Sequence, residues 1–206
     1  MKRTFGFNEK EMKVFQALSS PKKIQDFLED IPINFKDDYL SPRFVLQRNK
    51  AQCLEGALFA AAALMVHGQK PLLLDLTTVA GDQDHVVALF HSKGRWGAIS
   101  KTNHAVLRYR EPVYNNVREL AMSYFHEYFL DDGRKTLRTY SRPFDLTGFN
   151  KKNWTIDPRG LDYIADALDA SPHIDILSKD ALRVLRRADA IEIKAGKITE
   201  WKKPKR

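Results

Sequence analysis

The stretch NKAQCLEGALFAAAALMVHG, residues 49–68, holds the only cysteine of the chain, Cys53, at the front of an alanine-rich run. Apolar positions continue nearly all the way round this segment when it is drawn as a helix, and a helix of that kind must be enclosed by protein. Its small alanines let a sheet and neighbouring helices approach closely. Gly68 suits the position just past a helix end, so the sequence predicts a central buried helix that ends near His67.

The first turn of this helix differs from the rest, because Gln52, Cys53 and Glu55 are polar enough to face a cleft. A lone buried cysteine is usually an inert small hydrophobe. A thiol at a helix amino end, however, meets the positive pole of the helix dipole and unpaired N–H groups, which lower its pKa. With Asn49 as the predicted cap, the placement favours a thiolate nucleophile at Cys53.

The flanking sequence predicts an α+β fold, in which helices segregate against an antiparallel sheet. Tight turns at 81–84 and 91–94 separate three short apolar runs, which indicates an antiparallel meander. The expected strands are 71–77, 85–90 and 95–100. The expected helices are 8–18, 21–30, 114–130, 160–169 and 178–188, with a long ordered loop at 31–48 and a closing hairpin at 190–201. We expect residues 1–140 to form the core with its amino-terminal helices. Residues 141–206 would form a carboxy-terminal extension packed on that core as one domain.

A thiol nucleophile generally needs a base, and the base needs a group that orients it. Of the six histidines, His85 opens a strand directly after an acidic turn, at a sheet end that a helix tip can meet; His104 is the second choice. Asp84 would aim away from the His85 ring, because neighbours on a strand point to opposite faces. Ser100 and Asn103, which follow the adjacent strand, are both candidates for the third member.

The order of these features resembles the transglutaminase-like branch of the papain-like fold. The resemblance rests on KAQCLEGALFAAAAL, DHVVALF and RWGAIS, and covers residues 47–103. Across more of the chain, the sequence is similar to uncharacterised bacterial proteins of this type. The resemblance implies a core with a central helix packed on an antiparallel sheet. It also implies that Cys53 is the nucleophile and His85 the base.

Three further positions can be compared with the third catalytic residue and the oxyanion donor of the family. Ser100 stands where the strand of that branch typically ends in the Asp of Trp-x-x-x-Asp. Asn103 lies 18 residues past His85, comparable to the Asn that papain-like proteases use as third member. Gln47 lies six residues before Cys53, where papain-like enzymes place an oxyanion-stabilising Gln. Gln52 is the alternative amide donor.

Two functions follow. The first is acyl transfer from a peptide or protein amide through a Cys53 thioester, in a peptidase, amidase or transglutaminase-like enzyme. The second is a catalytically silent scaffold that binds nucleic acid or acidic partners through its basic surface, since the net charge is +8. The basic residues in question lie at 107–112 and in the series Arg134 to Arg142.

Other classes of function are disfavoured. Scattered histidines and one cysteine offer no close pair of zinc ligands, and glycine-rich phosphate loops are absent, so we expect no metal and no cofactor. No apolar run is long enough for a membrane span, and the amino terminus lacks the apolar stretch of a secretion signal. A cytoplasmic protein without membrane contact is the expectation, and the sequence leaves its oligomeric state open.

Overall fold

The computed structural model describes residues 4–36 and 38–202. Its strands are β1 (Leu72–Thr78), β2 (His85–Ser92), β3 (Arg95–Ile99), β4 (Arg110–Tyr114), β5 (Leu137–Ser141), β6 (Phe144–Asp145) and β7 (His173–Asp175). Its α-helices are α1 (Glu9–Ala17), α2 (Pro21–Asp30), α3 (Pro42–Arg48), α4 (Cys53–Val66), α5 (Val117–Tyr124), α6 (Asp162–Asp169), α7 (Lys179–Arg183) and α8 (Ala190–Gly196). Two 3₁₀ segments, η1 (Phe125–Glu127) and η2 (Leu146–Lys152), complete the described elements.

The strands form one antiparallel sheet in the order β4-β3-β2-β1-β5-β7, with β6 pairing beside β5 along β1. The predicted meander is present as β1, β2 and β3, and β4 continues it. The α+β class is therefore confirmed. Within the described residues, no helix is both long and apolar enough to cross a membrane.

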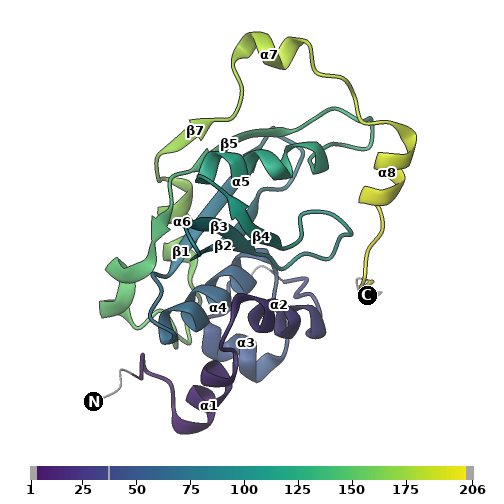
Figure 1. Cartoon of the computed structure of the whole chain (residues 1–206). Helices are drawn as coiled ribbons and strands as arrows, with labels where there is room; N and C mark the ends of the chain where they lie inside the picture. Colours follow the sequence, from purple (N-terminus) through teal and green to yellow (C-terminus); the bar gives the residue numbers. More distant parts are fainter. Residues whose placement is uncertain (1–3, 37, 203–206) are drawn as a thin grey trace.

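The two faces of the sheet are covered by different helices (Figure 1). On one face Leu73, Val86 and Ala88 pack with α4, which is buried along nearly its whole length as its apolar circumference predicts. On the other face Leu74 and Val87 pack with α5 and η1. The alternation of these neighbours along each strand decides which side chains at the sheet end face α4 and which face α5.

The start of α4 is fixed by Gln52 and Glu55 rather than by Asn49. Gln52 is the N-cap, and its Oε1 accepts a hydrogen bond from the Leu54 N–H at 2.8 Å. The Glu55 carboxylate accepts the Gln52 N–H at 2.7 Å, which completes a capping box. Asn49 instead ends α3 in the left-handed conformation, with φ of 49°. The predicted cap was wrong, and Cys53 is the first residue of α4.

Gly56 allows the first turn of α4 to press against the chain just past β3. A Cβ atom at position 56 would lie 2.3 Å from the Lys101 Cβ, inside any real contact distance. We predict that Gly56→Ala lowers the free energy of unfolding by about 1–3 kcal/mol, although alanine favours helix, because overpacking here displaces backbone. Urea denaturation measures this.

Gly148→Ala is the matched control, because nothing lies within 4 Å of a Cβ at that position. An unchanged stability of Gly56→Ala would show that α4 does not approach Lys101 this closely.

Several predicted elements differ from the observed ones. The loop at 31–48 contains α3, which begins with Pro42 after Ser41. The predicted helix 114–130 ends its α-helical part at Tyr124 and tightens into η1. The predicted helix 178–188 is reduced to α7, and the closing hairpin is instead α8, which an Asp189–Glu192 capping box starts. The division at residue 140 falls inside β5, so both predicted parts contribute strands to one sheet.

Candidate functional site

A pocket of about 820 Å³ lies at the end of the sheet where β1 finishes, β2 begins and α4 starts. Cys53, His85 and Asn103 all line it, together with Gln52. Residues from α6 and α8 contribute to its wall as well. The topology thus brings the predicted nucleophile and the predicted base to one cavity.

The Cys53 thiol is partly buried, and its Sγ donates to Gln52 Oε1 at 3.2 Å. Burial raises the pKa of this thiol above its usual value, although hydrogen bonds from the backbone N–H groups of Val86 and Leu54 act in the opposite direction. The charges of Asp75 and Glu55 raise it further. The expectation of a lowered pKa at Cys53 was therefore wrong: desolvation outweighs the helix terminus, and the resting sulfur carries its proton.

His85 is buried, and its ring is held by Ser100. His85 Nε2 lies 2.7 Å from Ser100 Oγ, which in turn donates to the Leu107 carbonyl at 2.5 Å. Because that carbonyl uses the hydroxyl proton, Ser100 Oγ accepts from the ring, which places the His85 proton on Nε2 and leaves Nδ1 as the basic atom. Burial lowers the pKa of His85 to about 4, so the ring is neutral near pH 7.

Cys53 and His85 share the pocket but are not hydrogen-bonded to each other, since the sulfur donates to Gln52 and the ring to Ser100. The strand register explains this. Val86 belongs to the core on the α4 side, so its neighbour His85 faces the α5 side, as does its cross-strand partner Leu76. The sulfur is next to the Val86 backbone, one residue from the base.

Asn103 does not orient His85. Its side-chain amide donates to the Trp201 carbonyl at 2.9 Å, and its Oδ1 accepts the Trp201 N–H at 2.8 Å. This pairing fastens the carboxy-terminal segment to the loop after β3. Of the two candidates for the third member, the structure brings Ser100 to the ring, whereas the side chain of Asn103 is paired with Trp201.

Gln47 also lies away from the thiol. It is exposed on α3, and it does not line the pocket around Cys53. The offset of six residues that suggested an oxyanion donor is taken up by the end of α3 and the turn at Asn49. Gln52 is the glutamine beside the sulfur, but it presents its oxygen, not its amide N–H, to Cys53.

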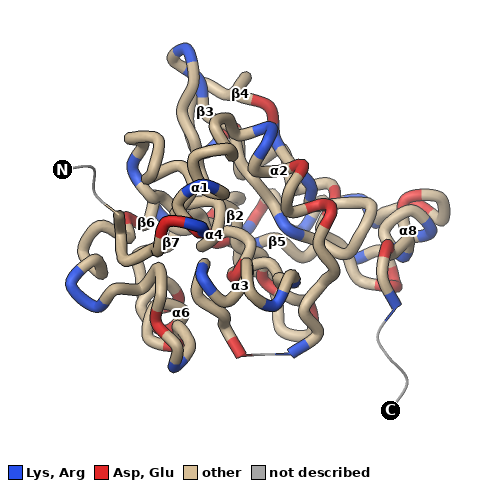
Figure 2. Tube along the Cα trace, turned by 90° about the horizontal axis from the view of Figure 1, so that it is seen from below, with Lys and Arg blue, Asp and Glu red and all other residues tan. Residues whose placement is uncertain are grey.

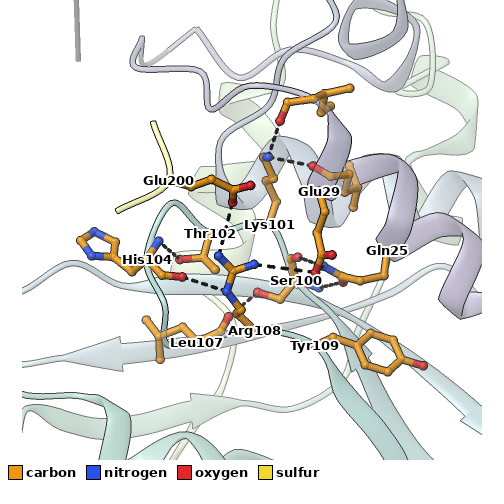
Figure 3. A network of polar contacts seen from close by, with 12 residues as sticks. Gln25, Glu29, Ser100, Lys101, Thr102, His104, Leu107, Arg108, Tyr109 and Glu200 are labelled. Carbon is orange, nitrogen blue, oxygen red and sulfur yellow. Dashed lines mark hydrogen bonds and ion pairs between the residues drawn. The ribbon is translucent and has the colours of Figure 1, made fainter. Parts of the chain in front are cut away.

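A polar network behind Ser100 was not predicted (Figure 3). The Gln25 side chain on α2 pairs with both backbone groups of Ser100, at 2.8 and 2.9 Å. The buried Lys101 ammonium donates to the carbonyls of Leu28 and Ile31, at the end of α2, and lies 4.2 Å from the Trp201 ring centre. These contacts join residues 70 or more positions apart, so no local pattern could indicate them.

Asp75 and His173 form a second unpredicted pair at the pocket. Asp75 is buried opposite Val86, and its Oδ2 lies 3.2 Å from His173 Nε2. His173 Nδ1 must donate to the Ser171 carbonyl at 2.7 Å, so a proton has to lie between Nε2 and Asp75. Burial raises the pKa of Asp75 to about 6 despite the histidine.

The pKa shifts of Asp75 and His85 predict opposite contributions to stability between about pH 4 and 6. The lowered pKa of His85 stabilises the fold at high pH, and this is lost as pH falls to about 4. The raised pKa of Asp75 stabilises the fold at low pH, and this is lost as pH rises through about 6. We predict that Asp75→Asn gains stability relative to the wild type, by about 2–3 kcal/mol, as pH rises across this window. Urea denaturation at several pH values measures the difference, and a pH-independent difference would contradict it.

Fold and site together define an α+β protein with a cysteine at the start of a buried helix and a histidine at the head of a neighbouring strand. No known protein-family model matches the chain. A search of the curated proteins likewise finds no match.

Proposed function

We propose that the protein is a thiol-dependent acyl-transfer enzyme on a papain-like, transglutaminase-like core, with Cys53 as nucleophile and His85 as general base. The observation that carries the proposal is the shared pocket, in which a helix-start thiol and a neutral, tautomer-fixed imidazole line one cavity. A volume of about 820 Å³ accommodates several residues of a peptide. Peptide or protein amides are the proposed substrates.

The reaction starts from a neutral pair rather than from an ion pair. The raised pKa of Cys53 and the lowered pKa of His85 keep the proton on sulfur at rest. As Sγ attacks the acyl carbonyl carbon, Nδ1 takes the thiol proton through one bridging water. The proton then passes to the leaving amine, the C–N bond breaks and a thioester remains. Water or a second amine completes the transfer.

The developing oxyanion needs donors, and the start of α4 supplies one. The backbone N–H of Cys53 is at the first helical position and has no acceptor within the helix. Because such groups are fixed before reaction, they stabilise the transition state without reorganisation. In the proposed mechanism, the Cys53 N–H therefore takes the place of the Gln47 side chain as the donor to the oxyanion.

The Leu107 carbonyl beside position 100 explains why a serine fits this site better than an aspartate. The hydroxyl donates to that carbonyl and accepts from His85 at the same time. A carboxylate could not donate, so aspartate would set a buried charge against a carbonyl oxygen. We predict that Ser100→Asp lowers the free energy of unfolding by about 2–4 kcal/mol, as measured by urea denaturation. Ser100→Thr, which keeps the hydroxyl, is the control, and an aspartate variant of wild-type stability would contradict this reading of the site.

The experiment is acylation by p-nitrophenyl acetate. We expect a burst of about one equivalent of nitrophenolate and an acetyl group on Cys53, found by mass spectrometry of the digested protein. Cys53→Ala should lose both. Nitrophenolate release that persists in Cys53→Ala, or a wild type that forms no adduct, would overturn the proposal.

A silent scaffold is the alternative, and the missing Cys53–His85 hydrogen bond favours it. Binding of nucleic acid or acidic partners through a basic surface is less well supported, because acidic and basic residues intermingle along the chain (Figure 2). Arg108 pairs with Glu29 and Glu200, and Arg110 pairs with Glu127 at 2.6 Å. In the second basic series, Arg134 and Lys135 are also ion-paired. The acylation experiment decides between the two functions.

A further inference from the structure

The pocket beside Cys53 is acidic, although the chain as a whole carries a net charge of +8. Its acidic lining residues are Asp75, Asp82, Asp84, Glu127, Asp131 and Asp169, and its lysines are Lys101 and Lys197. Neither lysine neutralises the centre of the pocket. The Lys101 ammonium is bound to carbonyls at the end of α2, and Lys197 pairs with Asp131 at 3.2 Å.

Three of these carboxylates, those of Asp75, Asp84 and Asp169, line the same pocket, and among the described residues none of them is paired with a lysine or arginine. The charges of Asp84 and Asp169 both raise the pKa of Asp75, and the charge of Asp84 raises that of Asp169, with burial the larger cause in each case. Asp84 is held toward the pocket by Thr78, whose N–H and hydroxyl donate to Oδ1 at 2.7 and 3.0 Å. Among the described residues, neither Asp84 nor Asp169 forms an ion pair.

Tyr128 supplies an independent indication of a ligand. It lines the same pocket, is 2% exposed, and its hydroxyl has no hydrogen-bond partner among the described residues. An unpaired buried hydroxyl destabilises the fold and calls for an explanation. Burial keeps it protonated by raising its pKa, and the charges of Asp82 and Asp84 act in the same direction. A ligand with a polar group would satisfy it.

We propose that this pocket binds a positively charged group on the acyl donor, with Asp84 and Asp169 supplying the charge and Tyr128 a hydrogen bond. The substrate class is then an amide or ester that carries an ammonium or guanidinium group near its acyl carbon. The inference rests on the proposed function for the reaction at Cys53, but the charge selectivity of the pocket does not require that reaction. The carboxylates do not form a metal site: among the described residues, no three acidic, histidine or cysteine side chains are arranged to hold an ion.

The test uses two thiol reagents of similar size and opposite charge, 2-aminoethyl and 2-sulfonatoethyl methanethiosulfonate. Each forms a disulfide with Cys53, the only cysteine, and releases methanesulfinate, so mass spectrometry gives both rates. We expect the ratio of the cationic to the anionic rate to exceed that of 2-mercaptoethanol by about 10-fold or more, and to fall as salt rises. The double variant Asp84→Asn, Asp169→Asn should lose most of this preference. Asp162→Asn, an exposed carboxylate at the other end of α6, should keep it.

Tyr128→Phe tests the hydroxyl separately. It should leave the thermal unfolding temperature unchanged or raise it, since an unsatisfied group is removed, yet slow the cationic reagent several-fold. Tyr163→Phe removes another unpaired hydroxyl outside the pocket and should leave labelling unchanged.

The outcomes separate this inference from the proposed function. A rate ratio equal to that of 2-mercaptoethanol would overturn the cationic site, even if nitrophenyl acetate acylates Cys53. A high ratio without acylation would uphold the charge selectivity and overturn the enzyme.

Discussion

Replacing His85 with alanine is expected to slow acylation of Cys53 by about 10²–10⁴-fold, the contribution of a positioned general base. The effect follows from the resting protonation states. The raised pKa of Cys53 leaves almost no thiolate near pH 7, so attack depends on a base that removes the proton during the reaction. The measurement is the nitrophenolate burst rate under single-turnover conditions.

The matched control is His91→Ala. His91 lies in the same strand, β2, but toward the far end of it, is exposed, and makes an edge contact with Trp96. Its removal should leave the burst rate unchanged. A His85→Ala protein that is folded and acylates at the wild-type rate would show that the buried ring is structural.

Replacing Glu55 with leucine is expected to destabilise the protein by about 3–5 kcal/mol, because several buried donors lose one shared acceptor. Glu55 has 0% exposure, and its carboxylate accepts from the Asn34 amide, the Leu40 N–H and the Gln52 N–H. These bonds attach the segment around 34–40 to the first turn of α4. The loss should therefore also change the reactivity of Cys53.

Glu119→Leu is the control for this second prediction. Glu119 occupies the same third position in α5 and also takes part in hydrogen bonds at its helix start, but those contacts are exposed. A much smaller loss of stability is expected there, because water replaces the lost hydrogen bonds. Urea denaturation of both variants measures the difference, and equal effects would contradict a special role for the buried Glu55.

The parts of the fold that the sequence predicts are those with local, periodic signals. The apolar circumference of α4 and the turns between β1, β2 and β3 are properties of neighbouring residues, and these elements are present as predicted. The helix α8 was mistaken for a hairpin, because the pattern around Gly196 suits a turn. The Asp189 cap with Glu192 three residues later was the available signal for a helix start.

The sequence predicted those features of the candidate site that depend only on the order of helices and strands along the chain. Placing Cys53 at a helix start and His85 at a strand head requires only the sequence, and both line one pocket. The ionisation of Cys53 depends on how deeply the sulfur is buried, which no spacing gives. The pairing of Asn103 with Trp201 spans 98 positions, and the acidic pocket collects residues from β1, the turn before β2 and α6.

The central claim is that a neutral His85 removes the proton from a neutral Cys53 thiol, and the rate of acylation against pH tests it most directly. Since the pKa of His85 is about 4 and that of Cys53 lies above its usual value, the wild-type rate should be nearly constant from about pH 5 to 8. The rate should fall only as pH drops toward about 4. A rate that rises about tenfold with each pH unit across this range would contradict the claim, because it would show that Cys53 reacts only as a free thiolate without a base.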